Sequence, residues 1–459
     1  MEHYSSTQLR AYLSYRDGLA VLDLKGERLF RVPDTVTELS EIEKLVLDKN
    51  SLVELPASIS KLENLTVLKL DGNKLAKLPA EIGDVKELKE LWVRDNQLVG
   101  LPTSIQRLTK LECLYLDENN LTELPSNIGD LSELRKLRVR DNQLVGLPTS
   151  IKRLTKLKTL YLDTNKLTEL PAEVGELKDL RGLWVSNNQL VALPMSIQRL
   201  TKLEGLDLDG NKLTELPAEM SDLREMKKLS VNGNQLVSLR TSIQRLTKLE
   251  ELYVSENKLT ELPAEIGDLR ELRVLWLSNN QLVCLPTSIQ RLTKLKGLYL
   301  SGNEVTELPS EIGDLGELRK LWVSYNQLVG LPTSIQRLTK LEELYLSGNK
   351  LTELPSEIGD LREMRELWVG NNQLVGLPTS IQRLTKLEEL YLDGNKLTEL
   401  PAEISDLREL RWLSVSNNQL VGLPTSIQRL TKLKWLHLDG NKLTAVSYTH
   451  LTLPTKRIV

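Results

Sequence analysis

The stretch LKELWVRDNQLVGLPTSIQRLTKL, residues 88–111, contains the pattern that decides the fold. Its first six residues alternate apolar and other side chains with a period of two, as a short β-strand does. This alternation directs Leu91 and Val93 into a core and turns Glu90 and Trp92 outward. An asparagine follows where the chain must turn, and a proline then precedes a short segment with helical spacing of its apolar residues.

The same stretch recurs every 23 residues along almost the whole chain. Its asparagine appears at every step from Asn50 to Asn441, and its proline from Pro33 to Pro424, with Arg240 as the one exception. A single unit cannot bury its leucines, whereas stacked units share one core and pair their strands in parallel. About 19 repeats of 23 residues therefore predict an α/β solenoid of the leucine-rich-repeat class. We expect a curved horseshoe with a parallel concave β-sheet and short helical or 3-10 convex segments.

Composition and charge restrict the possible partners and the compartment. Lysine and arginine number 60 against 63 aspartates and glutamates, which gives no reason to expect nucleic acid or an anionic membrane as a partner. Two cysteines, Cys113 and Cys284, allow no disulfide framework and favour a reducing compartment. The chain starts without a signal-peptide pattern and has no apolar run long enough to span a bilayer. We therefore expect a cytoplasmic, monomeric protein.

Three segments are expected. Residues 1–18 form an N-terminal cap, in which Ser5 and Gln8 fit a capping box. Residues 19–444 form the solenoid. Residues 445–459 fit neither repeat type and resemble translated adapter sequence, so we expect this tail to be artefactual and the natural C-terminal cap, with any domain beyond it, to be missing. The alternative is a short natural tail.

Two repeat types alternate, so that the duplicated unit is 46 residues long. The acidic repeat reads PAEIGDLREL, as at residues 263–272, and the basic repeat reads PTSIQRLTKL, as at residues 332–341. Two charged rows on the convex side consequently alternate in sign, and we expect each charge to face an opposite charge in both neighbouring repeats. A convex binding surface is the alternative; the stabilising explanation is preferred.

No constellation typical of catalysis is found in the sequence. The three histidines are scattered, no cysteine or histidine spacing suits a metal, and no glycine-rich phosphate loop follows a strand. Paired carboxylates occur only within a repeated solvated surface, so they are weak candidates for acid–base chemistry; they are Glu250-Glu251, Glu342-Glu343 and Glu388-Glu389. We expect no enzymatic activity, no cofactor and no metal.

Large aromatic residues gather at the outward strand positions. From Tyr253 to Tyr391, seven consecutive strands carry one there. Such residues are preferred anchors of protein interfaces, and an exposed apolar stripe of this length indicates a binding site. The alternative, compatible with the first, is a structural ladder of stacked rings. The predicted partner-binding residues, here called the aromatic stripe, are Trp92, Tyr115, Tyr161, Trp184, Tyr253, Trp276, Tyr299, Trp322, Tyr345, Trp368, Tyr391, Trp412 and Trp435.

A loosely basic zone is predicted on the same face toward the N-terminus. It consists of Arg94, Arg135, Arg138 and Arg140. This zone would suit an acidic region of a partner, and it is equally well explained as ordinary solvated surface. Residues 207–240 are irregular, which favours sequence drift over a division between two binding regions.

The phrase LPSEIGDLREMRELWVGNNQL, residues 354–374, carries a family resemblance. It is similar to intracellular leucine-rich-repeat proteins of the Ras-suppressor and Ras-pathway scaffold type, to plant Ras-group-related proteins, and to the repeat regions of Roco-type and death-domain proteins. The resemblance covers residues 19–444. It implies a scaffold that holds a signalling protein, such as a small GTPase or a phosphatase subunit, on its concave face. The alternative is the recognition half of a larger multidomain signalling enzyme that is truncated at its C-terminus.

Overall fold

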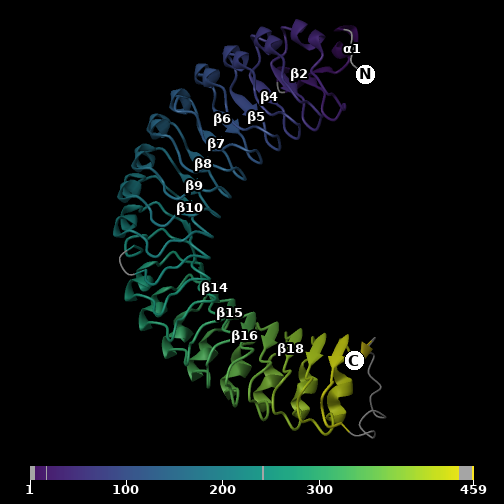
Figure 1. Ribbon diagram of the computed structural model, residues 1–459. Coiled ribbons are helices and arrows are strands. Elements are labelled where there is room, and N and C mark those ends of the chain that lie inside the picture. The colour runs from purple at the N-terminus through teal and green to yellow at the C-terminus, as the bar shows by residue number, and fades with distance from the viewer. Residues whose placement is uncertain (1–5, 17, 240–241, 444–456, 459) are drawn as a thin grey trace. The chain divides into compact units, whose positions relative to one another are not determined.

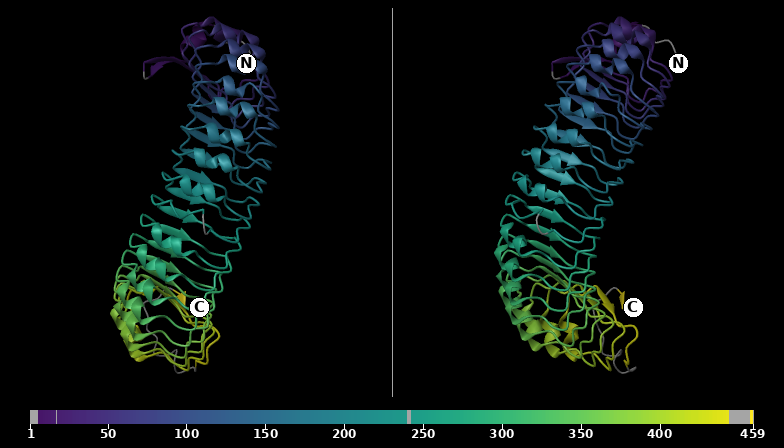
Figure 2. Two further views of the ribbon diagram at one scale, coloured as in Figure 1. Left: turned by 90° about the vertical axis from the view of Figure 1, so that its left-hand side faces the viewer. Right: turned by 60° about the vertical axis from the view of Figure 1, so that its left-hand side comes forward.

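The structure is a computed structural model that describes residues 6–16, 18–239, 242–443 and 457–458. It divides into an N-terminal unit, residues 1–226, and a C-terminal unit, residues 227–459. Within each unit the strands lie along the inner side of the stack and the helical turns along the outer side (Figure 1). Within each unit, successive repeats are stacked one upon the next (Figure 2).

The N-terminal unit begins with helix α1 (Ser6–Arg10) and the antiparallel strands β1 (Leu13–Arg16) and β2 (Leu19–Asp23). Its further strands are β3 (Lys44–Val46), β4 (Val67–Lys69), β5 (Glu90–Trp92), β6 (Cys113–Tyr115), β7 (Lys136–Arg138), β8 (Thr159–Tyr161), β9 (Gly182–Trp184) and β10 (Gly205–Asp207). Its 3-10 helices are η1 (Asp34–Glu38), η2 (Ala57–Lys61), η3 (Ala80–Asp84), η4 (Thr103–Arg107), η5 (Ile128–Asp130), η6 (Thr149–Arg153), η7 (Ala172–Glu176), η8 (Met195–Arg199) and η9 (Ala218–Asp222).

The C-terminal unit repeats this alternation. Its strands are β11 (Lys228–Ser230), β12 (Glu251–Tyr253), β13 (Val274–Trp276), β14 (Gly297–Tyr299), β15 (Lys320–Trp322), β16 (Glu343–Tyr345), β17 (Glu366–Trp368), β18 (Glu389–Tyr391), β19 (Trp412–Ser414), β20 (Trp435–His437) and β21 (Arg457–Ile458). Its 3-10 helices are η10 (Ala264–Asp268), η11 (Thr287–Arg291), η12 (Ser310–Asp314), η13 (Thr333–Arg337), η14 (Ser356–Asp360), η15 (Thr379–Arg383), η16 (Ala402–Asp406) and η17 (Thr425–Arg429).

The predicted parallel sheet is confirmed within each unit. Strands β2 to β10 pair in parallel one after another in the N-terminal unit, as do β11 to β20 in the C-terminal unit. Between these strands every partner lies 23 residues away, as Leu91 does from Leu114. Successive side chains of a strand point to opposite faces of the sheet. With this register, residues at the same position of neighbouring repeats therefore lie side by side in a continuous row.

The core follows from the leucine positions, and the convex turns follow from proline. Leu91 and Val93 are fully buried, as the alternation predicts. Pro102 adopts φ −66° and ψ 147° immediately before η4, and the turn closes when the N–H of Leu108 donates to the carbonyl of Ile105. Proline fixes φ and lacks an N–H that the first turn would leave unpaired, so it starts these short 3-10 segments at low cost; η5, which begins at Ile128, follows Asn127 instead.

The asparagine of each repeat joins two repeats through its side-chain amide. Asn96 Oδ1 accepts a hydrogen bond from the N–H of Leu75 at 3.0 Å. Asn96 Nδ2 donates to the carbonyl oxygens of Leu70 at 2.9 Å and Arg94 at 3.0 Å. The residue before it, Asp95, has φ 52°, which makes the tight turn that aims the amide inward. The buried asparagine thus satisfies backbone groups of the turn and of the preceding repeat.

A helix and an antiparallel strand lie at the N-terminal edge, within the segment expected to form the cap. Strand β1 pairs antiparallel with β2, and Leu9 of α1 is fully buried. An added antiparallel strand covers the edge that a first repeat would otherwise expose. The predicted capping box includes Ser5, which lies outside the described residues. In the predicted C-terminal tail, Arg457 and Ile458 pair with β20, and residues 444–456 lie outside the described part.

Ion pairs on the convex side join acidic repeats to the basic repeats that follow them. In one charged row, Arg107 contacts Asp84 at 2.9 Å; in the other, Lys340 contacts Glu317 at 2.5 Å. Ten further ion pairs between repeats in these two rows likewise join a basic residue to the acidic residue 23 positions before it. The expectation that each charge faces an opposite charge in both neighbouring repeats is therefore wrong for one of the two sides.

A glycine in several acidic repeats contributes to this one-sided pairing, while Ser221 and Ser405 occupy the same position in two others. A Cβ placed on Gly83 would overlap the carbonyl oxygen of Ser104 in the following basic repeat, and one on Gly313 would overlap that of Ser334. The absence of a side chain lets the following 3-10 turn approach closely, which brings the two charged rows together. Basic repeats carry a longer residue at the same position, such as Gln106.

Candidate functional site

The aromatic stripe forms stacks of rings on the strand face of the C-terminal unit, meaning the face of outward strand side chains. The ring centroids of Trp276 and Tyr299 are 4.2 Å apart, and those of Tyr345 and Trp368 are 4.4 Å apart with an interplanar angle of 13°. Trp322 joins these pairs, because it stacks on Tyr345 at 4.8 Å and meets Tyr299 edge to face at 4.7 Å. Strand register places one ring on every strand from β12 to β18, so the row is continuous.

The rings are mostly half-buried by their neighbours. Tyr299 keeps only 9% of its surface exposed, whereas Trp322, Tyr345, Trp368 and Tyr391 are intermediate. Stacking of this kind contributes about 0.5–1.5 kcal/mol per pair beyond the burial of area. The structural ladder and the predicted binding surface therefore use the same side chains, since the stacked rings still present edges and part of their faces to solvent.

Glutamates hold the polar tips of the rings. Trp322 Nε1 donates to Glu343 at 3.1 Å, the hydroxyl of Tyr345 donates to Glu366, and the hydroxyl of Tyr391 donates to Glu389 at 3.1 Å. These carboxylates occupy the first position of their strands, two residues before the ring position. Burial raises the pKa of both tyrosine hydroxyls, so they remain protonated donors at neutral pH.

The same arrangement continues at the start of the C-terminal unit. The hydroxyl of Tyr253 donates to Glu251 at 3.1 Å, and burial, followed by the nearby charge of Glu251, raises the pKa of Tyr253 to about 12. The ring of Tyr253 lies 6.3 Å from that of Trp276, further than the stacked pairs. Lys228 lies 5.1 Å from the centroid of the Tyr253 ring.

At the other end of the stripe the aromatic residues stand two positions earlier, at the first residue of their strands. Trp412 and Trp435 pair directly across β19 and β20, and their ring centroids are 5.3 Å apart. Trp412 also stacks on His437 at 5.1 Å. The ring centroids of Tyr391 and Trp412 are 6.0 Å apart, so the row of rings continues although the aromatic residue occupies a different strand position.

In the N-terminal unit the stripe is shorter and is covered by cations of the chain itself. Trp92 stacks on Tyr115 at 3.9 Å. Lys69 Nζ lies 4.2 Å and the Arg94 guanidinium 4.8 Å from the centroid of Trp92. Tyr161 stacks on Trp184 at 4.3 Å, and Arg138 lies 5.0 Å from the Tyr161 centroid. These rings already have the cation–π partners that a ligand would otherwise provide.

The predicted basic zone is built of ion pairs between neighbouring repeats. Arg94 contacts Asp71 at 2.6 Å, and Arg135 contacts Glu112 at 3.4 Å. The other two arginines also contact carboxylates, Arg138 that of Asp117 at 2.8 Å and Arg140 that of Asp163 at 2.8 Å. A partner would have to compete with these internal carboxylates, so the assignment of this zone as a binding site stays a prediction.

The aspartates of this zone have a structural role. Asp71 Oδ1 accepts a hydrogen bond from the N–H of Arg94 at 2.8 Å, and Asp117 Oδ1 accepts one from the N–H of Arg140 at 3.0 Å. Each aspartate thus satisfies a backbone group of the next repeat beyond the end of the strand. Burial raises the pKa of Asp117, although its hydrogen bond with Arg140 opposes that rise.

The paired glutamates are divided between different partners. Glu342 contacts Arg319 at 2.7 Å, whereas Glu343 contacts Lys320 at 2.7 Å. Glu388 contacts both Arg365 and Arg411 at 2.8 Å, and Glu250 contacts Arg273 at 3.4 Å. The two carboxylates of a pair point to different neighbours, which is not the arrangement that general acid–base chemistry requires.

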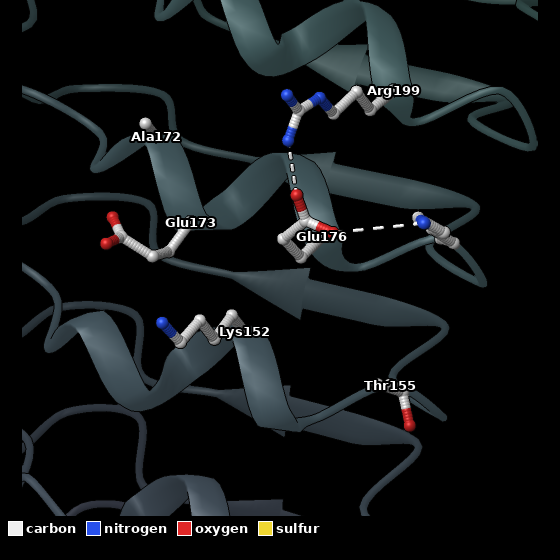
Figure 3. Close-up of a pocket in the computed structure, with 7 residues that line it drawn as sticks. Lys152, Thr155, Ala172, Glu173, Glu176 and Arg199 are labelled. Carbon is white, nitrogen blue, oxygen red and sulfur yellow. Dashed lines mark hydrogen bonds and ion pairs between the residues drawn. The ribbon is translucent and has the colours of Figure 1, made fainter.

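A hollow on the convex side of the N-terminal unit is lined mainly by charged side chains. Figure 3 shows Lys152 and Glu173 facing the hollow, with Arg199 above them. Glu176 contacts Arg199, and it also contacts Lys178 at 3.9 Å. These residues belong to the convex charged surface that recurs from repeat to repeat, so the hollow has no chemistry of its own.

Metal and thiol chemistry find little support in the described residues. No group of three or more His, Cys, Asp or Glu side chains in residues 6–16, 18–239 and 242–443 is placed to hold a metal ion. Cys113 is half-buried on β6, and burial raises the pKa of its thiol, which disfavours the nucleophilic thiolate. Cys284 is exposed. No helix in the same part of the chain is both long and apolar enough to cross a bilayer.

Tyr325 is an exposed aromatic residue of the C-terminal unit that the sequence pattern did not identify; Tyr15 and Phe30 are exposed in the N-terminal unit. Tyr325 is 66% exposed and adopts φ 55° at the turn after β15. Its ring covers Gly348 of the next repeat, where an added Cβ would lie 2.7 Å from the ring. A bulky residue at a left-handed turn position, where most other repeats carry Gly, Asn or Asp, is the sequence signal that could have identified it.

Family models of leucine-rich repeats match much of the chain. A leucine rich repeat model matches residues 17–75, 86–144, 179–236 and 385–443, and a leucine-rich repeat region model matches residues 116–189, 252–328 and 311–395. No curated protein sequence matches the chain.

Solved structures with the same fold cover nearly the whole chain. A leucine-rich-repeat protein of Leptospira interrogans is 32% identical over 99% of this chain and 98% of its own, with a TM-score of 0.63. The plant peptide hormone receptor RGFR1, solved in complex with RGF2, is 31% identical over 93% of this chain and 75% of its own, with a TM-score of 0.74. YopM from Yersinia enterocolitica is 28% identical over 99% of this chain and 94% of its own, with a TM-score of 0.70.

Proposed function

This chain belongs to the leucine-rich repeat family, and from that premise we propose that it is a protein-binding scaffold whose partner docks on the strand face of the C-terminal unit. The observation that carries the proposal is the unbroken row of seven aromatic rings from Tyr253 to Tyr391. Half-buried aromatic residues fixed by their neighbours lose little conformational entropy on binding, which suits them as interface anchors.

The relatives support a protein partner of this kind. The plant receptor RGFR1 was solved with RGF2 bound, and the family is typically used for protein interaction. In keeping with the resemblance to Ras-suppressor-type proteins, we propose that the scaffold acts in cytoplasmic signalling, with a small GTPase or a phosphatase subunit as the expected class of partner. The scaffold itself has no catalytic role in this proposal.

A fourfold substitution within the stripe tests the proposal. The variant carries Tyr299→Ala, Trp322→Ala, Tyr345→Ala and Trp368→Ala, and capture of partner proteins by the immobilised chain is compared with wild type. We expect capture to be lost while far-UV circular dichroism shows that the solenoid persists. Unchanged capture by a folded variant would contradict the proposal.

A matched control removes apolar surface from another row. The valines that follow the turn in basic repeats are exposed, and four of them lie in the C-terminal unit at 46-residue intervals: Val283, Val329, Val375 and Val421. Changing these four to alanine should leave capture intact, because they lie outside the outward strand positions. Loss of capture in this control would show that exposed apolar area in general, and not the stripe, is responsible.

A further inference from the structure

Two carboxylates on adjacent strands of the aromatic stripe, Glu366 and Glu389, form no ion pair with a described residue, and Lys320, which is paired with Glu343, attracts Glu366 only from a greater distance. Glu343, Glu366 and Glu389 stand directly opposite one another on β16, β17 and β18. Glu343 is neutralised by Lys320 at 2.7 Å. Glu366 and Glu389 accept hydrogen bonds from tyrosine hydroxyls but form no ion pair with any residue that the structure describes. Like charges placed directly opposite each other across strands disfavour the folded state.

The immediate surroundings add further negative charge. The outward and flanking positions of β16, β17 and β18 carry six acidic residues and one basic residue, a difference of −5. The six are Glu342, Glu343, Glu366, Glu388, Glu389 and Asp393, and the one is Arg365. Basic residues of the adjoining strands reach only some of them: Arg319 contacts Glu342, Lys320 contacts Glu343 and Arg411 contacts Glu388.

The rings beside these carboxylates also lack cations. Trp92, Tyr161 and Tyr253 each have a lysine or arginine over the ring, at 4.2, 5.0 and 5.1 Å from the centroid. Within the described part of the chain, no lysine or arginine lies over a ring between Trp276 and Tyr391. The aromatic residues at this repeat position therefore fall into two groups. Some have a lysine or arginine of the chain over the ring, and the others have none among the described residues.

From this contrast we infer that the surface around Trp368, Glu366 and Glu389 binds a basic segment of the partner protein. A guanidinium or ammonium group would lie against the exposed parts of the rings while the two carboxylates balance its charge. An arginine suits this place best, since its planar guanidinium both stacks on aromatic rings and donates in parallel to carboxylate oxygens. The inference rests on the proposed function and specifies the chemistry of the partner.

The direct test uses the purified chain and a synthetic peptide. The probe is a nine-residue Gly/Ser peptide with three alternating arginines, and its reference is the same peptide with glutamine in place of arginine. Binding is measured by calorimetry and by tryptophan fluorescence at low salt. We expect the arginine peptide to bind at least about 10-fold more tightly than the glutamine peptide, with the difference shrinking as salt is raised.

Two variants locate the site. Glu366→Gln with Glu389→Gln keeps the hydrogen-bond acceptors for the tyrosines but removes the charges, and should weaken binding of the arginine peptide about 10-fold. Glu90→Gln is the matched control, because Glu90 accepts from Trp92 Nε1 at 3.0 Å but stands beside a ring already covered by Lys69 and Arg94. It should leave binding unchanged.

The outcomes separate this inference from the proposed function. Equal affinity for the two peptides, or full binding by the Glu366→Gln/Glu389→Gln variant, would overturn the inference while leaving capture through the aromatic rings untouched. Continued partner capture by the fourfold aromatic variant would instead overturn the proposed function. Loss of arginine-peptide binding in the Glu90→Gln control to the same extent as in the double variant would also overturn the inference, because it would place the site elsewhere.

Discussion

At the scale of single residues, Glu366 illustrates how a side chain can oppose the stability of the free protein. Its burial raises the pKa of the carboxyl group, and the charges of Glu343 and Glu389 raise it further, against the hydrogen bond that it accepts from Tyr345 and the charge of Lys320. Because the pKa in the folded state lies above the ordinary value of 4.5, the charged form is disfavoured by folding. The charge therefore reduces stability at neutral pH, as expected of a residue kept for binding.

Glu366→Gln should consequently stabilise the protein at pH 7, by less than about 1 kcal/mol for a partly exposed charge. The gain should disappear as the pH falls through the raised pKa and below 4.5, where both the folded and the unfolded chain carry the neutral acid. Urea unfolding midpoints at pH 7 and pH 4 measure this difference. An equal gain at both pH values would show that charge is not its cause.

Glu317→Gln provides the control of opposite sign. The pKa of Glu317 is lowered by its hydrogen bond with Lys340, so its charged form is favoured by folding. This contribution is present above the ordinary pKa of 4.5 and is lost as the pH falls through the lowered value. The substitution should therefore lower the urea midpoint at pH 7 and have less effect at acid pH.

The asparagine row depends on buried hydrogen bonds that one residue makes to two repeats. Asn326 is 3% exposed, accepts from the N–H of Val305 at 2.9 Å and donates to the carbonyl of Leu300 at 3.0 Å. Asn326→Ala leaves these backbone groups unpaired, so we expect a loss of about 2–4 kcal/mol in the free energy of unfolding. The adjacent exposed Gln327→Ala is the control, and similar urea midpoints for the two variants would contradict this account.

At the scale of elements, the close approach of successive 3-10 turns depends on glycine. Gly313→Ala in η12 would push a methyl group into the carbonyl oxygen of Ser334, so η13 must shift away. We expect a loss of about 1–3 kcal/mol, as for other overpacked interfaces. Gly330→Ala is the matched control, because a Cβ there meets nothing within 4 Å. Thermal unfolding of the two variants should differ clearly; equal transitions would show that the turns adjust freely.

The sequence predicts these elements well where one repeat determines its own geometry. The strand alternation, the proline before each turn and the inward asparagine all follow from positions within a single 23-residue repeat, and the structure confirms them. The sequence does not predict with which of the two neighbouring repeats a charged side chain forms its ion pair. The contact of Arg107 with Asp84 depends on how closely Gly83 and Ser104 pack. Strand β1 was also missed, since its short segment carries no repeat signal.

At the scale of the whole molecule, the sequence predicts where the aromatic stripe lies. It does not predict which of its rings have a lysine or arginine over them. Strand parity gives Trp92 and Trp368 the same outward position on their strands. Whether a ring is covered by a cation depends on the conformations of long side chains in neighbouring repeats, such as Lys69 over Trp92. The difference between covered and uncovered rings, on which the inferred basic partner depends, therefore emerges only when the repeats are stacked.

The one-sided ion pairs make the 46-residue pair of repeats the natural unit of insertion and deletion. Deleting residues 331–353 would place the acidic repeat of Asp314 next to that of Asp360. Deleting residues 331–376 would restore an acidic-to-basic junction, with Asp314 now followed by Arg383. Since solenoid stability is a sum of repeat and nearest-neighbour terms, the first deletion should lose two exposed ion pairs and gain like-charge contacts at that junction, which lowers stability.

We therefore expect the shorter variant, which lacks residues 331–376, to have the higher urea midpoint of the two. Chain length acts against this prediction, because removing more repeats removes more stabilising interfaces. A higher midpoint for the shorter chain can then be attributed to the matched junction. If the variant lacking residues 331–353 is instead the more stable, repeat number outweighs repeat type, and the alternation of acidic and basic repeats has no stabilising role at the level of the whole solenoid.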